Sequence, residues 1–147
     1  MLERSIGLLV FALTLAAGVA LWRLYAAHQV QQLGRTSLPE QLASLALPGQ
    51  PAVLYFTTAT CAQCRLQQTP ALAQVQARRQ NLNLVKLDAV DQRELADFYH
   101  VMTVPTTVVL DRTGRPVAVN HGLATPDRLL AQLEQADTTT TKRLERK

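Results

Sequence analysis

Cysteine, histidine and aromatic residues are scarce in this 147-residue sequence, which has two cysteines, three histidines and an aromatic content of 5%. Both cysteines lie in one motif, Cys61-Ala62-Gln63-Cys64, so no structural disulfide elsewhere indicates an oxidising compartment. The few aromatic side chains offer few platforms on which nucleic-acid bases could stack. The sequence therefore favours neither a disulfide-framed secreted domain nor a nucleic-acid-binding one.

Net charge is also lacking over most of the chain. The formal net charge is +4, but residues 36–136 hold eight basic and eight acidic side chains and so carry a net charge of zero. The excess lies in the two flanks, residues 1–35 and 137–147, each of which nets +2. A nucleic-acid interface needs a basic patch on the folded surface, and we expect no nucleic-acid partner.

The two cysteines follow an apolar run, Ala52 to Phe56, that is typical of a buried strand, and the residues after them have helical spacing. The first thiol is thus placed at a helix N-terminus, where unpaired N–H groups and the helix dipole favour a thiolate. The second thiol lies one helical turn further on and is more buried. This arrangement predicts a redox-active dithiol with Cys61 as nucleophile and Cys64 as resolving cysteine.

Other segments, in the same order and spacing, extend the pattern. Thr103-Val104-Pro105-Thr106 opens a second apolar run about forty residues later, Gly122 follows a third run, and Lys86 lies in an alternating strand-like segment. With the cysteine motif, these positions resemble the thioredoxin family over roughly residues 38–136. The resemblance implies an α/β fold, a three-layer α/β/α sandwich with a mixed central sheet in which Lys86 lies on the central strand.

The resemblance also assigns site residues. It implies that Cys61 and Cys64 are catalytic, and that Thr60, Val104, Pro105 and Gly122 bind substrate, with a cis Val104–Pro105 bond facing the cysteines. The chain departs from the family at three places. Thr60 replaces the usual tryptophan, Ala62-Gln63 replaces Gly-Pro, and Tyr55 occupies the position of a buried acid that assists proton transfer. We interpret Tyr55 as a packing residue.

Other readings of the motif remain open. Cys-x-x-Cys supplies two of the four ligands of a zinc site, but the other ligands would come from His28, His100 and His121, none of which are paired at ligand spacing. A structural disulfide would close a very small loop and constrain the unfolded chain little. A redox-inert thioredoxin-like module that binds a partner at the membrane is the alternative function. We expect no metal and no organic cofactor.

The N-terminal segment from Ser5 to Trp22 carries no charged residue. As a helix it would extend roughly 27 Å, close to the thickness of a bilayer's hydrocarbon core. Trp22 and Tyr25 suit a membrane interface. The competing interpretation is a cleaved signal peptide, because Gly18-Val19-Ala20 resembles a cleavage site. We predict an uncleaved, single-pass anchor in the cell membrane. The count of basic residues favours a cytoplasmic redox domain, whereas the resemblance to anchored relatives, which often face outward, implies the other side of the membrane.

These observations divide the chain into four parts: a membrane anchor (1–26), a polar stalk (27–37), a thioredoxin-like domain (38–136) and a disordered basic tail (137–147). Within the domain, the helix after the motif should contain Pro70 and direct Leu66, Leu72, Ala73 and Val75 inward. Residues 111–116 form a hairpin turn, and Pro126 opens the last helix. The predicted function is a membrane-tethered thiol–disulfide oxidoreductase whose partners are protein disulfides and a reductase or other electron donor.

Overall fold

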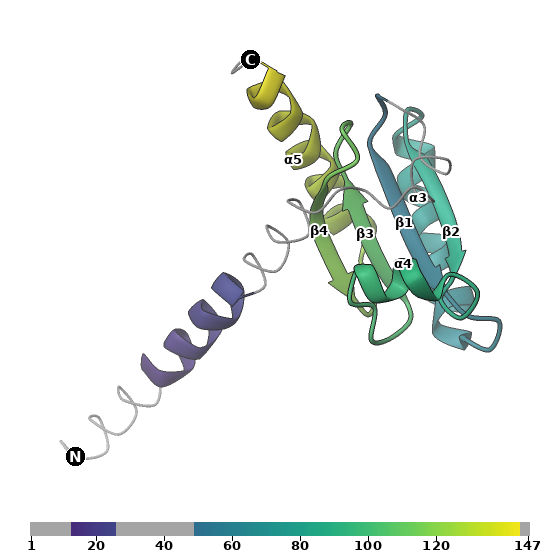
Figure 1. Ribbon diagram of the computed structural model, residues 1–147, viewed down its shortest axis with the longest axis horizontal. Coiled ribbons are helices and arrows are strands. Elements are labelled where there is room, and N and C mark those ends of the chain that lie inside the picture. The colour runs from purple at the N-terminus through teal and green to yellow at the C-terminus, as the bar shows by residue number, and fades with distance from the viewer. Residues whose placement is uncertain (1–12, 26–48, 145–147) are drawn as a thin grey trace.

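The structure is a computed structural model that describes residues 13–25 and 49–144. The predicted stalk lies outside these residues, as do the start of the predicted anchor and the last three residues of the predicted tail. The domain from residue 49 onward is built on a four-stranded sheet (Figure 1).

The strands are β1 (Ala52–Thr57), β2 (Asn83–Asp88), β3 (Thr106–Leu110) and β4 (Pro116–His121). Their order across the sheet is β2-β1-β3-β4. β1 pairs with β2 in parallel, and the β1–β3 and β3–β4 pairs are antiparallel. The predicted mixed sheet is therefore confirmed. Every residue of β1 and β3 is buried, as expected for central strands covered on both faces.

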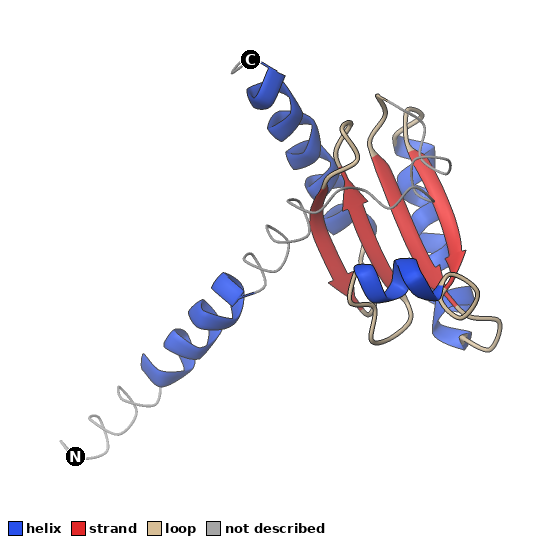
Figure 2. Ribbon diagram, in the orientation of Figure 1, coloured by secondary structure: helices blue, strands red, loops and turns tan. Residues whose placement is uncertain are grey.

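Helices cover both faces of this sheet (Figure 2). The segment after the cysteines forms a π-helical turn, η1 (Cys64–Gln68), that continues into α3 (Thr69–Arg78), and the last helix is α5 (Pro126–Leu144). These pack with Val53 and Tyr55 on one face. The short α4 (Arg93–Phe98) packs with Leu54 and Phe56 on the other. Alternate side chains of β1 thus enter two separate cores, and the three-layer α/β/α arrangement follows.

The turn between β3 and β4 is organised by one buried carboxylate. Asp111 Oδ1 accepts hydrogen bonds from the Thr113 backbone N–H (2.9 Å), the Thr113 hydroxyl (2.6 Å) and the Arg115 backbone N–H (3.0 Å). Gly114 has φ +79°, a left-handed conformation that glycine adopts without steric cost. The hairpin predicted at residues 111–116 is confirmed, and it delivers β4 to the edge of the sheet.

The prediction of inward residues after the motif is wrong at two positions. Leu72 and Val75 are buried, but Leu66 is 75% exposed and Ala73 is also exposed. The inward positions are Cys64 and Gln68, followed by Leu72 and Val75. These four residues are spaced by four, four and three positions, which is the spacing of one helix face. The prediction followed apolar character, so it included Leu66, which lies off this face, and left out the polar Gln68, which lies on it.

Two further expectations need correction. Lys86 is exposed on β2, which is an edge strand among the described strands rather than a central one. The predicted disordered tail from residue 137 is wrong as far as Leu144, because α5 continues to that residue. Asp137 forms ion pairs with Arg79 and Arg112, and the buried Thr140 shows that this part of the helix still packs on the domain.

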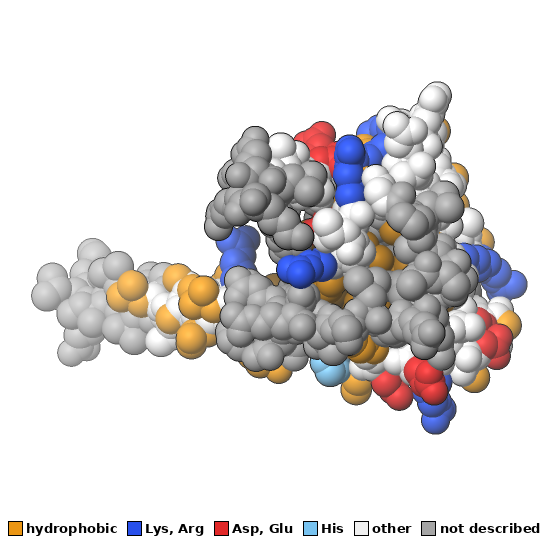
Figure 3. All heavy atoms as spheres, turned by 45° about the horizontal axis from the view of Figure 1, so that its top comes forward, with side chains coloured by type: hydrophobic (Ala, Val, Ile, Leu, Met, Phe, Trp, Pro, Cys, Tyr) orange, Lys and Arg blue, Asp and Glu red, His pale blue; other side chains and the backbone are white. Residues whose placement is uncertain are grey.

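Residues 13–25 form a helix whose large apolar side chains are exposed, among them Leu13, Trp22 and Tyr25. No helix within residues 13–25 and 49–144 is both long enough and apolar enough to cross a membrane. Residues 1–12 and residue 26 of the predicted anchor (1–26) lie outside that range, and these include the first eight residues of the uncharged segment from Ser5 to Trp22. On the face of the molecule in Figure 3, charged side chains of both signs are interspersed, which agrees with the net charge of zero over residues 36–136.

The Tyr99→Phe variant is expected to be more stable than the wild-type chain. The Tyr99 ring is 1% exposed and packs against Phe98 (4.9 Å between ring centroids) and Phe56 (6.2 Å). Its buried hydroxyl finds no hydrogen-bond partner among the described residues. Removing a buried, unpaired hydroxyl should raise the free energy of unfolding by about 1 kcal/mol, measured by urea unfolding at neutral pH.

The gain in Tyr99→Phe should grow in alkaline solution. Burial raises the pKa of Tyr99 well above its ordinary value of 10.0. Above pH ~10 the unfolded chain releases the phenolic proton while the folded chain retains it, so wild-type stability falls as the pH rises. The variant lacks this contribution. Equal unfolding curves for the two proteins at neutral pH and above pH ~10 would contradict the burial of an unpaired Tyr99 hydroxyl.

Candidate active site

The cysteine motif lies where β1 ends and a helix begins. The Cys61 backbone N–H donates to the Thr58 carbonyl (3.2 Å), and the Arg65 N–H donates to the Cys61 carbonyl (3.3 Å). These hydrogen bonds close a tight turn after β1 and begin the helix. Phe56, at the end of β1, pairs with Thr106 at the start of β3, and Thr106 pairs with His121 at the end of β4. The motif, the loop before β3 and the loop after β4 therefore lie at the same end of the sheet.

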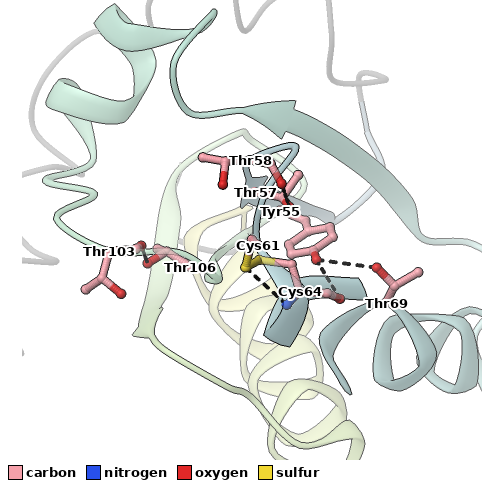
Figure 4. The surroundings of a disulfide bond; sticks show 8 residues. All are labelled: Tyr55, Thr57, Thr58, Cys61, Cys64, Thr69, Thr103 and Thr106. Carbon is pink, nitrogen blue, oxygen red and sulfur yellow. Dashed lines mark hydrogen bonds between the residues drawn. A yellow bond between two sulfur atoms is a disulfide. The ribbon is translucent and has the colours of Figure 1, made fainter. Parts of the chain in front are cut away.

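Cys61 and Cys64 form a disulfide, with their Cα atoms 5.3 Å apart (Figure 4). Cys64 is completely buried and Cys61 is half-buried. The Cys64 backbone N–H donates to Cys61 Sγ at 3.1 Å. The two sulfurs thus differ in access, and the accessible one lies at the start of the helix with an N–H group directed at it.

The other predicted site residues lie at the same end of the sheet as the disulfide. The Val104–Pro105 bond is cis, as the resemblance implied, and Pro105 is buried. Val104 is half-buried and packs against both cores. Gly122 has φ +85° and its N–H donates to the Pro105 carbonyl (2.8 Å). Thr60 is exposed immediately before Cys61. Their roles in substrate binding stay predictions.

Tyr55 lies directly beneath the motif. Its side chain is 2% exposed, and its hydroxyl donates to the Cys64 carbonyl at 3.1 Å. The same hydroxyl lies 3.4 Å from the Thr69 hydroxyl, on the next turn of the helix (Figure 4). Tyr55 packs in the core, as the sequence predicted, and in addition fixes the backbone of the π-helical turn that carries Cys64. No local pattern of residues predicted the contact with Thr69.

Residues 38–137 match the family of thioredoxin-like domains, which is more than half of the chain. The chain belongs to this family. No curated protein sequence matches it.

Solved structures share the fold of this thioredoxin-like domain. Thioredoxin-2, described as a component of malaria parasite protein secretion machinery, is 22% identical with a TM-score of 0.55, covering 61% of this chain and 86% of its own. Chloroplastic thioredoxin z is 22% identical with a TM-score of 0.56, covering 66% and 88%. Oxidised mitochondrial thioredoxin 3 from Saccharomyces cerevisiae is 19% identical with a TM-score of 0.56, covering 73% and 98%. At these identities the likeness concerns the fold alone.

Sequence reasoning missed one buried polar residue of the thioredoxin-like domain, Gln68. Its side chain is completely buried at the end of η1. Gln68 Nε2 donates to the Ala124 carbonyl (3.2 Å), and the Ala124 N–H donates to Gln68 Oε1 (2.8 Å). A glutamine among polar helix neighbours looks like a surface residue, and its partner lies 56 positions away in the sequence. No local pattern could have revealed this contact.

The residues available to a metal ion are dispersed in the described part of the thioredoxin-like domain. Within residues 13–25 and 49–144, no three His, Cys, Asp or Glu side chains gather in a way that could hold a metal ion. His121 is exposed at the end of β4, and His28 lies outside the described residues. Both sulfurs of the cysteine motif are joined to each other.

Proposed function

We propose that this protein is a thiol–disulfide oxidoreductase that exchanges disulfides with protein substrates. The observation that carries the proposal is the unequal pair of sulfurs: a half-buried Cys61 and a fully buried Cys64 in one disulfide, at the N-terminus of a helix. The thioredoxin-like fold also supports the proposal. No observation favours the redox-inert binding module.

In the first step, the reduced protein uses the Cys61 thiolate as nucleophile. The Cys64 N–H group, which lies 3.1 Å from Cys61 Sγ, and the helix N-terminus stabilise negative charge on that sulfur. The thiolate attacks one sulfur of a substrate disulfide. A Cys61–substrate disulfide forms, the substrate disulfide breaks, and the second substrate sulfur leaves as a thiolate that takes a proton from water.

In the second step, Cys64 loses its proton to water and the resulting thiolate attacks Cys61 Sγ, while the departing substrate sulfur takes a proton from water. The Cys61–Cys64 disulfide forms and the mixed disulfide breaks, which releases the second substrate thiol. Two electrons have passed from the dithiol to the substrate. The burial of Cys64 keeps it from reacting first with external disulfides. A dithiol reductase or another electron donor returns two electrons to the cysteine pair, and the same steps run in reverse oxidise a substrate dithiol.

The test is insulin reduction by the wild-type chain with dithiothreitol as electron donor, together with a titration of the cysteine pair against dithiothreitol. The proposal requires a reversible two-electron transition between dithiol and disulfide, and precipitation of insulin chains faster than with dithiothreitol alone. A stable disulfide that forms reversibly but leaves insulin untouched would favour the binding module instead.

We propose further that the domain is tethered to the cell membrane as a single-pass protein. The uncharged segment from Ser5 to Trp22 supports this, as do the exposed apolar side chains of the helix over residues 13–25, which include Leu13, Leu21 and Trp22. Each buried CH₂ group contributes about 0.8 kcal/mol to membrane partition. The basic residues that flank the segment favour a cytoplasmic domain.

The tether predicts that the full-length chain sediments with membranes and resists extraction by high salt and by alkaline carbonate. A chain that begins at Gln31 should remain in the supernatant, because it lacks the apolar segment. Immunoblots of membrane and soluble fractions provide the measurement, and N-terminal sequencing provides the control. Recovery of a mature chain that begins near Leu21 would replace the anchor with a cleaved signal peptide.

A further inference from the structure

We infer that Gln68 is a positioning residue that fixes the loop after β4 against the helical turn that carries Cys64, and thereby presents Leu123 to a protein substrate. This inference rests on the proposed function for its substrate. It concerns a residue that does not touch the reacting sulfurs and acts through the loop.

The first observation is the pairing of Gln68 with Ala124. The Gln68 side chain is completely buried, and its amide both donates to the Ala124 carbonyl (3.2 Å) and accepts from the Ala124 N–H (2.8 Å). The amide therefore binds this backbone much as a neighbouring strand would. A buried amide that makes both hydrogen bonds holds its partner in one place, because breaking either leaves a buried polar group unpaired.

The second observation is that the other end of the same loop is also fixed. The Gly122 N–H donates to the Pro105 carbonyl at 2.8 Å. Ala124 is 2% exposed and packs in the same core as Cys64, with Cys61 and Val104 at its border. One series of hydrogen bonds therefore joins the loop of Pro105, the loop after β4 and the turn η1, which are the three segments around the disulfide.

Between the two fixed residues stands one exposed apolar side chain. Leu123 is 38% exposed, while Gly122 and Ala124 on either side are bound through their backbones. Pinning both neighbours restricts the direction in which Leu123 can point. A substrate chain that reaches Cys61 approaches this same end of the sheet. The fixed loop therefore offers the substrate the Leu123 side chain as an apolar contact in a constant position.

The test compares Gln68→Met with Gln67→Met in the full-length chain. Methionine matches glutamine in length but removes both hydrogen bonds, and Gln67 is the exposed neighbour that serves as the matched control. Gln68→Met should raise the KM for insulin about 10-fold while kcat changes little, because the loop moves and the sulfurs do not. Alkylation of reduced Cys61 by iodoacetamide should stay within about 2-fold of the wild-type rate. Gln67→Met should change none of these values.

The Gln68→Glu variant adds a test that depends on pH. The protonated carboxyl group can donate and accept as the amide does, whereas the carboxylate can only accept. The KM ratio of variant to wild type should therefore be large at pH 8 and fall toward 1 as the pH is lowered through the pKa of the new carboxyl group. Division by the wild-type value at each pH removes the titration of Cys61.

Amide hydrogen exchange at Ala124 tests the contact without any activity measurement. The wild-type Ala124 N–H should be protected, and Gln68→Met should lose about 100-fold of that protection. If wild-type protein fails to reduce insulin, the proposed function fails, and exchange alone then decides whether Gln68 fixes the loop. Unchanged exchange at Ala124, or an unchanged KM in a folded Gln68→Met protein that reduces insulin, would overturn the inference.

Discussion

A Cys64→Ser variant should accumulate as a mixed disulfide with its protein substrates, whereas a Cys61→Ser variant should accumulate none. In the proposed mechanism, the half-buried Cys61 attacks the substrate, and the fully buried Cys64 is required only to release it. Without Cys64 the first step is completed and the second cannot occur. Both variants should lose insulin reduction by about 10³-fold or more. Non-reducing gel electrophoresis of affinity-purified variants shows the trapped complexes.

The same assignment of roles can be checked in the wild-type protein after reduction. Iodoacetamide at mildly acidic pH should label Cys61 before Cys64, because only Cys61 is both accessible and at the helix N-terminus. Peptide mapping by mass spectrometry identifies the labelled residue. Ala62→Ser serves as a control, since it changes the exposed turn but leaves both sulfurs in place. Earlier labelling of Cys64, or trapped complexes in Cys61→Ser, would reverse the two roles.

Replacement of Leu72 by alanine should produce the largest loss of stability among substitutions in the helix after the motif. Leu72 is 1% exposed and packs in the core between the sheet and α5. Truncating a buried leucine costs about 2–5 kcal/mol, a large share of the roughly 5–15 kcal/mol that stabilises a typical domain. Thermal unfolding should show a decrease in Tm of more than about 8 °C.

Leu66→Ala is the matched control, because it makes the same chemical change six residues earlier. Leu66 is 75% exposed, and its truncation should change the free energy of unfolding by no more than about 0.5 kcal/mol. The two leucines are six residues apart and therefore lie on different faces of the helix, of which only the face of Leu72 is buried. Equal losses in the two variants would contradict the orientation of this helix on the sheet.

The contrast between these two leucines shows where sequence reasoning succeeded and where it failed. The apolar runs predicted β1 and β3, because a strand that is covered on both faces consists largely of consecutive apolar residues. The turn at residues 111–116 was predictable because Asp111 and Gly114 are turn-forming residues by their own chemistry. Inside the helix, the buried face includes the polar Gln68 and excludes the apolar Leu66, so a choice of inward residues by apolar character alone fails there.

The residues of the active site also fall into two groups, those that the sequence identified and those that it did not. Cys61, Cys64 and Pro105 could be identified because short motifs and their spacing mark them. Tyr55, Thr69 and Gln68 could not be placed, because their hydrogen bonds join residues separated by 9 to 56 positions. These contacts depend on tertiary packing that brings polar atoms together in the interior. Lys86 was misplaced for a related reason, since the order of strands in a sheet is not a local property.

The double ion pair of Asp137 sets a practical limit on how short this domain can be made. Its carboxylate forms ion pairs with Arg79, at the end of α3, and with Arg112, in the turn after β3. One residue therefore links α5 to α3 and to this turn. A chain truncated after Ala136 would keep every apolar residue that is buried in the described part of the domain, and would still leave two guanidinium groups without their shared acceptor. The folding unit therefore extends beyond the apolar core described above, and expression of a minimal domain should retain the helix through at least Thr140, the last buried residue among those whose side chains the structure describes.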